Sequence, residues 1–252
     1  MTIDSPSREQ LPALRALWRE AFGDGEEFLD RFTETAFSPD RCRCVTEEGR
    51  PVAALYWFDC AREGEQIAYL YAIATARSHR GRGLCSALME DTHRHLCARG
   101  FAAALLVPGE PSLFTFYEKL GYRVCCSVGE LACRAGEEAL SLREIDTVEY
   151  ARRRRELLPL GGVIQEGENL RFLSTLATLY AGDGVLLAAQ REGDTLHGLE
   201  LLGDPRSAPA ILRELGCSHG RFRVPADERP FAMIRPLGDR PVSPTYFGLA
   251  FD

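Results

Sequence analysis

Residues 73–85 read Ile73-Ala74-Thr75-Ala76-Arg77-Ser78-His79-Arg80-Gly81-Arg82-Gly83-Leu84-Cys85, and they carry the strongest local signal in the sequence. An apolar, strand-like run passes into a glycine-rich turn, and the turn opens a helix that we expect over residues 83–99. Glycine lets the backbone come close to a ligand and adopt dihedral angles that side chains forbid. The first amides of a helix lack partners, and the helix dipole adds positive charge there, so such a turn binds anions. The segment therefore predicts a strand–loop–helix site for a phosphate-bearing ligand.

Other glycine-rich phosphate loops fit this segment less well. A Walker loop needs the pattern G-x-x-x-x-G-K-[ST], which the sequence does not contain. A dinucleotide-binding fingerprint needs a third glycine at position 86, where the chain has Ser86. The alternative that stays open is an ordinary glycine-rich turn without a ligand.

Apolar spacing on both sides of the loop predicts a mixed α/β layout. The first helical pattern stops at Gly23, a residue typical of helix C-caps. Runs rich in β-branched and aromatic residues alternate with turns and predict strands. The expected order in the first half is helices over 11–22 and 26–36, strands over 41–46, 52–60 and 66–75, the helix over 83–99, a strand over 101–107, a short helix from Ser112, and a strand over 122–133.

The polar stretch 134–139 is the expected domain boundary. Beyond it the sequence predicts helices over 142–158, 170–180 and 205–215 and strands over 185–190, 196–202, 220–224, 231–236 and 246–251. This order repeats that of the first half, and the turns 47–50 and 191–194 occupy matching places, so we expect a structural duplication. An unrelated α+β domain is the alternative. In place of a phosphate loop the second half has Gly203-Asp204-Pro205, where the acid would repel phosphate.

The loop resembles the signature of the GNAT superfamily of N-acetyltransferases, which is R/Q-x-x-G-x-G/A at the end of the fourth strand. Gly81 and Gly83 match its glycines, and Arg80 with Arg82 gives the frequent R-G-x-G variant. Ser78 stands where the family often has Arg or Gln, so the chain departs from the pattern there. The backbone N–H groups that would bind the phosphate do not depend on that side chain.

A second segment, Phe116-Tyr117-Glu118-Lys119-Leu120-Gly121-Tyr122, resembles the Y-E-K-x-G-F element that closes the cofactor site in the same superfamily. The resemblance covers residues 1–135. The two-part layout is also distantly similar to the tandem-domain acetyltransferases of the enhanced-intracellular-survival type.

The resemblance implies a mixed α/β (α+β) sheet with the GNAT acyl-CoA N-acyltransferase fold in residues 1–135. A degenerate GNAT-like α+β domain without a cofactor site would follow in residues 140–252. The implied activity is transfer of an acetyl group from acetyl-CoA, a co-substrate, to a primary amine of a small molecule or of a lysine side chain. The alternative is a non-catalytic acetyl-CoA-binding sensor or assembly module, and a homo-oligomer is compatible with both.

The resemblance also implies which residues bind the cofactor. Backbone groups of Ile73, Ala74 and Thr75 would contact the pantetheine arm and the thioester carbonyl, where an N–H group stabilises the developing oxyanion. The residues implied for the pyrophosphate are Arg80, Gly81, Arg82, Gly83, Leu84 and Cys85.

Tyr117 is the candidate general acid, because the family uses a tyrosine at this position. Coenzyme A leaves as a thiolate with a pKa of about 8.5, and a phenol with a pKa of about 10 can supply its proton. Aromatic packing beside Phe114 and Phe116 is the alternative reason for a tyrosine here.

The general base has several candidates. The family commonly has Asn about seven residues before the tyrosine, and this chain has Glu110 there. A carboxylate in a dry cleft can accept an ammonium proton through water, whereas the alternative is a solvated loop acid. The terminal carboxylate of Asp252 is another candidate, by analogy with the tandem enzymes. Asp24, Glu26 and Glu27 could attract a cationic acceptor or simply form a solvated helix start.

Charge and composition narrow the classes of partner. The net charge of −7 argues against nucleic-acid binding, which leaves a basic footprint on the protein. The run Arg152–Arg155 has Glu149 and Glu156 at helical pairing distance, so we expect surface charge there. No apolar stretch approaches the roughly 20 residues that span a bilayer. The polar N-terminus lacks signal-peptide features, and the default expectation is a cytoplasmic protein without membrane contact.

We expect no metal site. His93 and His95 lack companions at metal-ligand spacing, and the cysteines include no C-x-x-C pair. The nine cysteines lie mostly in apolar runs and are expected to be reduced thiols.

Overall fold

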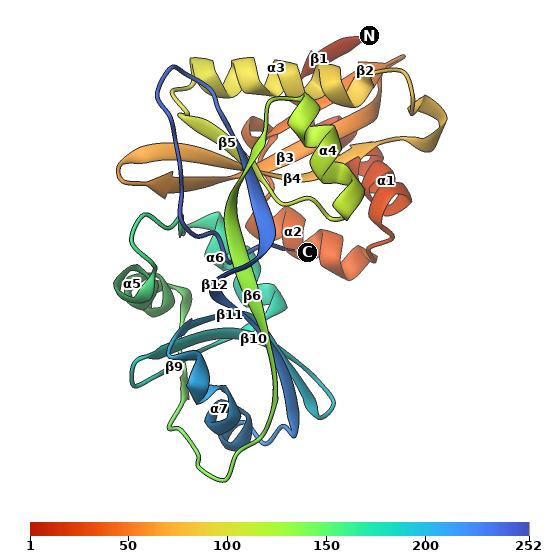
Figure 1. Cartoon of the computed structure of the whole chain (residues 1–252). Helices are drawn as coiled ribbons and strands as arrows, with labels where there is room; N and C mark the ends of the chain where they lie inside the picture. The colour runs from red at the N-terminus through yellow and green to blue at the C-terminus, as the bar shows by residue number, and fades with distance from the viewer. Residues whose placement is uncertain (252) are drawn as a thin grey trace. The chain divides into compact units, whose positions relative to one another are not determined.

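The computed structural model describes residues 1–251 (Figure 1). The chain divides into two compact units. The first consists of residues 1–106, 112–123 and 234–242, and the second of residues 107–111 and 124–233 with the described residues from 243 onward. Each unit is therefore built from stretches that are distant in the sequence.

The first unit is an α/β layer structure. Its strands are β1 (Thr2–Asp4), β2 (Cys42–Glu47), β3 (Arg50–Arg62), β4 (Glu65–Thr75) and β5 (Ala103–Leu106), adjacent in that order. Its helices are α1 (Leu11–Phe22), α2 (Glu26–Thr35), α3 (Leu84–Ala98) and α4 (Pro111–Lys119), with 3-10 turns η1 (Arg8–Gln10), η2 (Pro39–Arg41) and η3 (Arg77–His79). Strands β1 to β4 pair antiparallel, and β4 pairs with β5 in parallel through the crossover helix α3.

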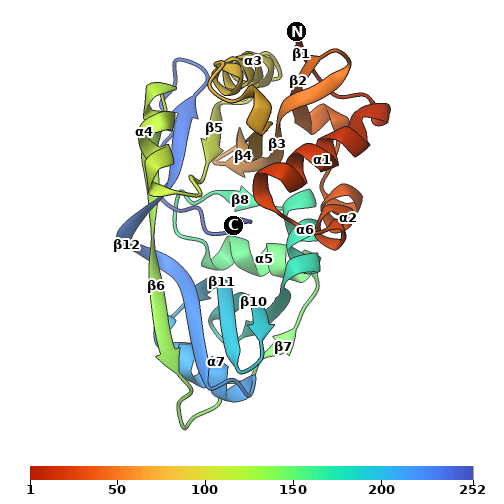
Figure 2. The same cartoon turned by 90° about the vertical axis from the view of Figure 1, so that its right-hand side faces the viewer.

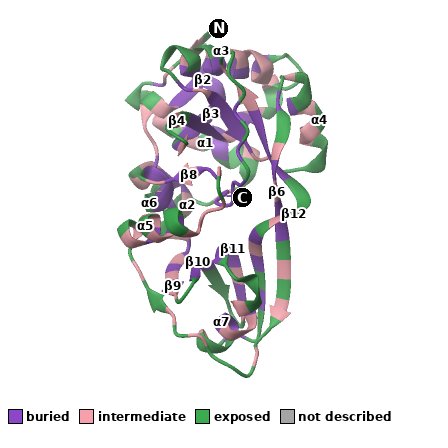
Figure 3. Ribbon diagram, turned by 60° about the vertical axis from the view of Figure 1, so that its left-hand side comes forward, coloured by how far each residue is buried: buried purple, intermediate pink, exposed green. Residues whose placement is uncertain are grey.

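Helices cover both faces of this sheet (Figure 2). Strand β3 is an almost continuous apolar run, and it is buried along most of its length (Figure 3). Side chains of neighbouring strand residues point to opposite faces. Tyr56 accordingly packs on Trp18 of α1, whereas Trp57 packs on His95 of α3. The run is apolar at every position because neither face meets water.

The second unit repeats the order of elements. Its strands are β6 (Arg123–Arg134), β7 (Arg143–Glu144), β8 (Ile164–Gln165), β9 (Thr178–Gly182), β10 (Val185–Glu192), β11 (Thr195–Gly203) and β12 (His219–Pro236). Arg123 at the start of β6 and residues 234–236 at the end of β12 belong to the first unit. Its helices are α5 (Thr147–Leu157), α6 (Glu168–Leu176) and α7 (Ala208–Glu214), with the 3-10 turn η4 (Pro205–Ser207). Strands β9, β10 and β11 pair antiparallel, and β11 pairs with β12 in parallel after α7. The same sequence of pairings occurs in β2, β3, β4, α3 and β5 of the first unit.

Three further features concern residues 1–251. No helix in this range is long and apolar enough to cross a membrane. No group of three or more potential metal ligands occurs among the described residues. All nine cysteines lie in the described range as free thiols, and of these Cys97 is exposed.

Candidate functional site

The loop between β4 and α3 needs its two glycines for backbone conformation. Gly81 and Gly83 both have a φ of 75°, in the left-handed region that side chains rarely adopt. A Cβ atom built at either position would meet no heavy atom within 4 Å. The glycines are therefore required by the turn itself, and the space around them is open.

This loop presents a row of unpaired amides. Gly83 is the N-cap of α3 without a side-chain cap, and the first amide to find an acceptor is Ala87, which donates to the Gly83 carbonyl at 3.0 Å. The backbone N–H groups of residues 81–86 donate to no acceptor in the described part of the chain. Residues 81–83 are exposed, while the Leu84 side chain is buried and anchors the helix start. The arrangement is a ready anion cradle.

The basic side chains of the loop are held by neighbours. Arg82 forms a bidentate pair with Glu47 of β2, with N–O distances of 2.8 and 3.2 Å. His79 Nε2 lies 3.5 Å from the same carboxylate. Arg80 turns back, and its Nε donates to the Thr75 carbonyl at 3.2 Å. A phosphate would therefore compete with Glu47 for Arg82.

Strand β4 carries a β-bulge just before the loop. Its register with β3 shifts between the pairs Tyr56–Tyr71 and Ala54–Ala74, and Ala72 within the bulge has a φ of 47°. On its other edge the described ladder with β5 ends at the Tyr69–Leu105 pair. The last residues of β4, which include Ile73, Ala74 and Thr75, thus extend past the ladder that β5 provides. A bulge commonly re-aims a strand beside a functional site.

Tyr117 lies in α4 with its ring buried. The ring packs against Phe116 at 5.2 Å and against Tyr122 at 5.8 Å between centroids. Burial raises the pKa of Tyr117 well above that of a free phenol, and the nearby Cys85 thiol adds to the rise. Tyr117 of α4 and Cys85 at the start of α3, both predicted site residues, are thus near each other.

The Tyr117 side chain is buried, with 7% of its surface exposed. Its hydroxyl donates to no residue in the described range, and it is not among the buried oxygens that lack a hydrogen-bond partner. Its ring is fixed by packing against Phe116 and Tyr122. Packing and a chemical role are compatible at this position.

Glu110 directly precedes α4, the helix that carries Tyr117. Glu110 is exposed and belongs to the stretch 107–111 of the second unit, whereas Tyr117 belongs to the first. Asp252 lies outside the described residues. Glu110 and Asp252 as bases therefore stay predictions.

The acids just before α2 and in its first turn have local partners. Asp24 accepts a hydrogen bond from the Trp18 indole nitrogen at 2.7 Å, and Glu26 pairs with Arg15 at 2.5 Å. Glu27 pairs with Arg31 four residues along the same helix. These pairs support the interpretation as a helix start with surface ion pairs.

Sequence reasoning missed the residues that hold α4. Arg235 donates to the Leu120 carbonyl at 2.8 Å and pairs with Glu90, although it follows Leu120 by 115 positions. Tyr122 and His93 are joined by a hydrogen bond of 2.7 Å between the hydroxyl and Nε2. No local pattern marks Arg235, because its role depends on a late return of the chain to the first unit.

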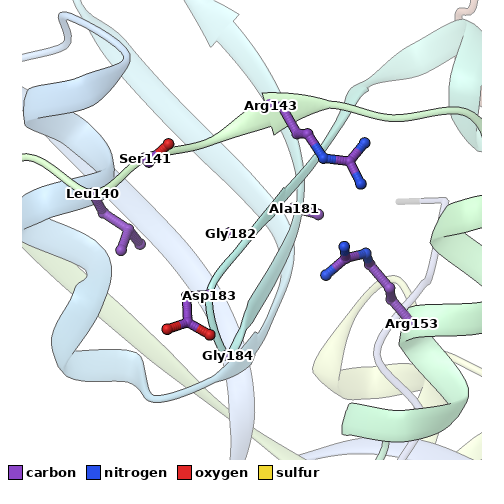
Figure 4. Close-up of a pocket in the computed structure, with 8 residues that line it drawn as sticks. All are labelled: Leu140, Ser141, Arg143, Arg153, Ala181, Gly182, Asp183 and Gly184. Carbon is purple, nitrogen blue, oxygen red and sulfur yellow. The ribbon is translucent and has the colours of Figure 1, made fainter.

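A pocket of about 410 Å³ occurs in the second unit (Figure 4). Arg143 and Arg153 extend toward it from opposite sides, and both pair with Glu149. Hydrogen bonds from Arg143 and then Arg153 lower the pKa of Glu149 to about 2, so the cations already have an anionic partner. The described lining includes none of the predicted site residues.

Comparisons with known proteins agree with this architecture. Residues 2–125 match the family model of the acetyltransferase (GNAT) domain. No curated protein matches the sequence. Among solved structures, a GCN5-related N-acetyltransferase from Kribbella flavida is 15% identical with a TM-score of 0.73, over 93% of this chain and 70% of that one.

Two further structures show the same fold. A GCN5-related N-acetyltransferase from Anabaena variabilis is 13% identical with a TM-score of 0.73, over 94% of this chain and 73% of that one. Eis1 from Mycobacterium abscessus is 14% identical with a TM-score of 0.69, over 94% and 74%. At these identities the likeness is one of fold, and it spans residues of both units. Residues 2–125 of the chain therefore form a GNAT acetyltransferase domain.

Proposed function

We propose that the protein is an N-acetyltransferase that moves an acetyl group from acetyl-CoA to a primary amine of a small molecule or of a lysine side chain. The observation that supports this most is the row of unpaired amides at residues 81–86, with the Tyr117 phenol close to Cys85 in the same row. The amides can hold the pyrophosphate of the cofactor, and the phenol can donate a proton to its sulfur.

The cofactor would bind first through its phosphates. Backbone N–H groups of residues 81–86 donate to the pyrophosphate, and each hydrogen bond to a charged group contributes about 1.5–3 kcal/mol. The dipole of α3 adds to this, because its positive end lies at Gly83. Several such bonds make the loop the main anchor.

The acyl arm would lie along the end of β4. Pantetheine contains amide groups, and these can pair with backbone groups of Ile73, Ala74 and Thr75 as an additional strand would. A backbone N–H directed at the thioester oxygen stabilises the oxyanion that develops when the amine attacks. The bulge at Ala72 is suited to turning one amide of β4 toward that oxygen.

The chemical step needs one proton donor and one proton acceptor. The amine nitrogen forms a bond to the thioester carbon, the C–S bond breaks, and the thiolate takes the proton of the Tyr117 hydroxyl. Burial keeps this phenol protonated by raising its pKa. Burial also raises the pKa of the Cys85 thiol to about 11, and a thiolate leaving in the same surroundings is made more basic in the same way. Glu110 would accept the proton of the amine.

The experiment is a thiol-release assay over a panel of primary amines, run with the wild-type chain and with Tyr117→Phe. We expect thiol release with at least one amine. The Phe variant should lower kcat by about 10²–10⁴, the range for general acid–base catalysis, with the calorimetric Kd for acetyl-CoA nearly unchanged. Tyr180→Phe, a half-buried tyrosine of the second unit, is the matched control.

Failure of the proposal has a distinct signature. A folded chain that binds acetyl-CoA but releases no thiol with any amine would be a sensor or assembly module instead. Equal turnover of wild type and Tyr117→Phe would remove Tyr117 from the mechanism while leaving the transferase intact.

A further inference from the structure

The carboxyl end of α4 is fixed by a distant arginine. After Tyr117 the chain makes a tight turn, in which Leu120 and Tyr122 both donate backbone hydrogen bonds to the Tyr117 carbonyl, at 2.9 and 3.1 Å. The Leu120 carbonyl points out of this turn and accepts a hydrogen bond from Arg235 Nη1 at 2.8 Å. Helix ends leave such carbonyls without intrahelical partners, so the cation caps the helix that carries Tyr117.

The same guanidinium connects α4 to α3. Arg235 Nη1 lies 2.5 Å from Glu90 Oε1, and Glu90 belongs to α3. The side chain of Arg235 passes beside Gly121, where an added Cβ would lie 3.6 Å from its Cδ and Nε atoms. One planar group therefore holds the turn after α4 against the middle of α3.

Arg235 is delivered by a short segment that returns to the first unit. We call residues 234–242 the clasp. Leu237 of the clasp donates to the Ala102 carbonyl at 2.9 Å, and the Val242 carbonyl accepts from Arg123 Nη2 at 3.2 Å. These hydrogen bonds fix the clasp at both ends.

Apolar packing does not fill the space beside the clasp. A pocket of about 400 Å³ lies between α3 and the clasp, with Glu90, His93 and Arg235 in its lining. Across this pocket α3 contacts the clasp through the Arg235 guanidinium and through the Cys97 thiol, which donates to the Leu237 carbonyl at 3.2 Å. Arg235 and Glu90 are both partly exposed, so each can be substituted without leaving a deeply buried charge.

A second contact connects the turn to the Tyr117 ring. The Tyr122 ring packs edge-on against Tyr117, and the Tyr122 hydroxyl is held by His93 of α3. Tyr117 thus lies between Cys85 at one end of α3 and a turn that is tied to Glu90 and His93 further along the same helix. Movement of the turn would move the Tyr117 hydroxyl relative to the anion cradle.

We propose that Arg235 is a positioning residue for Tyr117: by joining the Leu120 carbonyl to Glu90, it sets where the Tyr117 hydroxyl stands relative to the sulfur of bound acetyl-CoA. The inference rests on the proposed function. It extends the active site to a residue that the chain supplies only after the whole of β6 to β11.

The effect should appear in kcat and not in cofactor binding. A displacement of about 1 Å in a reacting group can cost roughly 10²-fold in rate. In the full-length chain we expect Arg235→Gln to lower kcat by about 10- to 100-fold, with KM and Kd for acetyl-CoA changed less than about threefold, because the amides of residues 81–86 do not move. Arg235→Lys should recover part of kcat, since an ammonium can replace one of the two connections but not both. Arg206→Gln, which breaks an exposed pair with Asp204, is the matched control.

A double-mutant cycle separates this inference from the proposed function. If Arg235 acts through Tyr117, then Arg235→Gln should not lower kcat further in a Tyr117→Phe background. Independent effects that multiply would overturn the inference while leaving the role of Tyr117 intact. No effect of Tyr117→Phe alone would instead refute the proposed acid.

Glu90→Gln covers the case in which Arg235→Gln does not fold. This variant keeps the hydrogen bond to Leu120 but removes the charge that holds Arg235 against α3. A loss of kcat without a rise in KM, again absent in the Tyr117→Phe background, supports the proposal. An unchanged kcat in folded Glu90→Gln and Arg235→Lys would overturn it.

Discussion

At the scale of single residues, the loop between β4 and α3 allows the backbone requirement of the fold to be tested separately from ligand binding. Gly83 adopts a left-handed conformation, which Asn and Asp tolerate better than other side chains. A Cβ there meets nothing in the protein within 4 Å, so a short side chain should fit. That side chain would nevertheless point into the region where the unpaired amides would hold a phosphate.

We therefore expect Gly83→Asp to fold and to lose acetyl-CoA binding. Its carboxylate would meet the pyrophosphate, whereas Gly83→Asn presents the same shape without the charge and should weaken binding less. Calorimetry with coenzyme A on both variants measures the difference, and circular dichroism checks the fold. Unchanged affinity in a folded Gly83→Asp would show that the phosphates bind elsewhere.

Glu47 should oppose cofactor binding. It occupies Arg82 through two hydrogen bonds and places a negative charge near the proposed phosphate site. Glu47→Gln frees Arg82 and removes that charge. For a partly exposed pair worth up to about 1 kcal/mol, we expect the Kd for acetyl-CoA to fall by up to about fivefold.

Salt tests the origin of this effect, because screening weakens interactions between exposed charges. The gain in affinity of Glu47→Gln should shrink when calorimetry is repeated at high ionic strength. Weaker binding by Glu47→Gln would mean that Glu47 organises the loop instead of competing with the ligand.

At the scale of elements, a buried charge network holds the second unit together. Arg154 of α5 makes a bidentate pair with Glu200 of β11, at 2.7 and 2.9 Å, and both side chains are buried. Arg154 also donates to Gln165 of β8, and Gln165 donates to the Leu249 carbonyl near the chain end. Because both charges are buried, removal of either side chain's charge would leave the other without a counter-charge in the protein interior.

We expect Glu200→Gln to lower the free energy of unfolding by about 3–5 kcal/mol, because it leaves Arg154 buried without a counter-charge. Urea denaturation followed by circular dichroism measures this change. Glu166→Gln, which breaks a surface pair with Arg155, should cost less than about 1 kcal/mol. Equal losses in the two variants would contradict the burial argument.

This network also shows where local sequence patterns are insufficient. The helical pairs of Arg152 with Glu156 and of Arg153 with Glu149 follow the expected spacing. The interpretation of the whole run as surface charge is wrong for Arg154, since its partner Glu200 comes from a strand 46 positions later. Spacing within a helix can predict partners four residues away, but it carries no information on tertiary partners.

Element boundaries show the same limit. The helix expected over 170–180 ends at Leu176, and Thr178 begins a strand paired with β10. The helix expected over 142–158 begins only at Thr147, where Asp146 caps it by accepting from the Glu149 amide at 2.8 Å. Apolar periodicity is ambiguous where a short helix runs directly into a strand. The loop with Gly81 and Gly83 was predictable, because the left-handed backbone that calls for glycine is a property of the loop itself.

At the scale of the whole molecule, the two units share one order of elements. They differ in chemistry at the loop that follows β4 in the first unit and β11 in the second. After β4 the first unit has open glycines and unpaired amides. After β11 the second unit has Gly203, where a Cβ would lie 2.0 Å from the Gly184 carbonyl oxygen. The backbone there is in close contact with its own neighbour, so the packing of β11 against Gly184 requires this glycine.

The first unit also needs a segment that comes late in the sequence. Residues 234–242 belong to it, and Arg235 within them caps α4. A fragment that stops near residue 135 would lack this clasp. Binding and activity should for that reason be compared in full-length variants.

We expect the full chain to bind one coenzyme A. In the second unit Asp204 accepts the Arg206 amide and pairs with the Arg206 side chain, so the first donor after Pro205 is already used. Proline supplies no amide, and the carboxylate would repel a phosphate. Helix α7 has only seven residues and a proline in its first turn, which leaves few amides to present. Calorimetry should give a stoichiometry of one for the wild type and for the control Asp204→Asn, and no binding for Gly83→Asp. A stoichiometry of two, or half of the sites surviving in folded Gly83→Asp, would place a second cofactor site outside the β4–α3 loop.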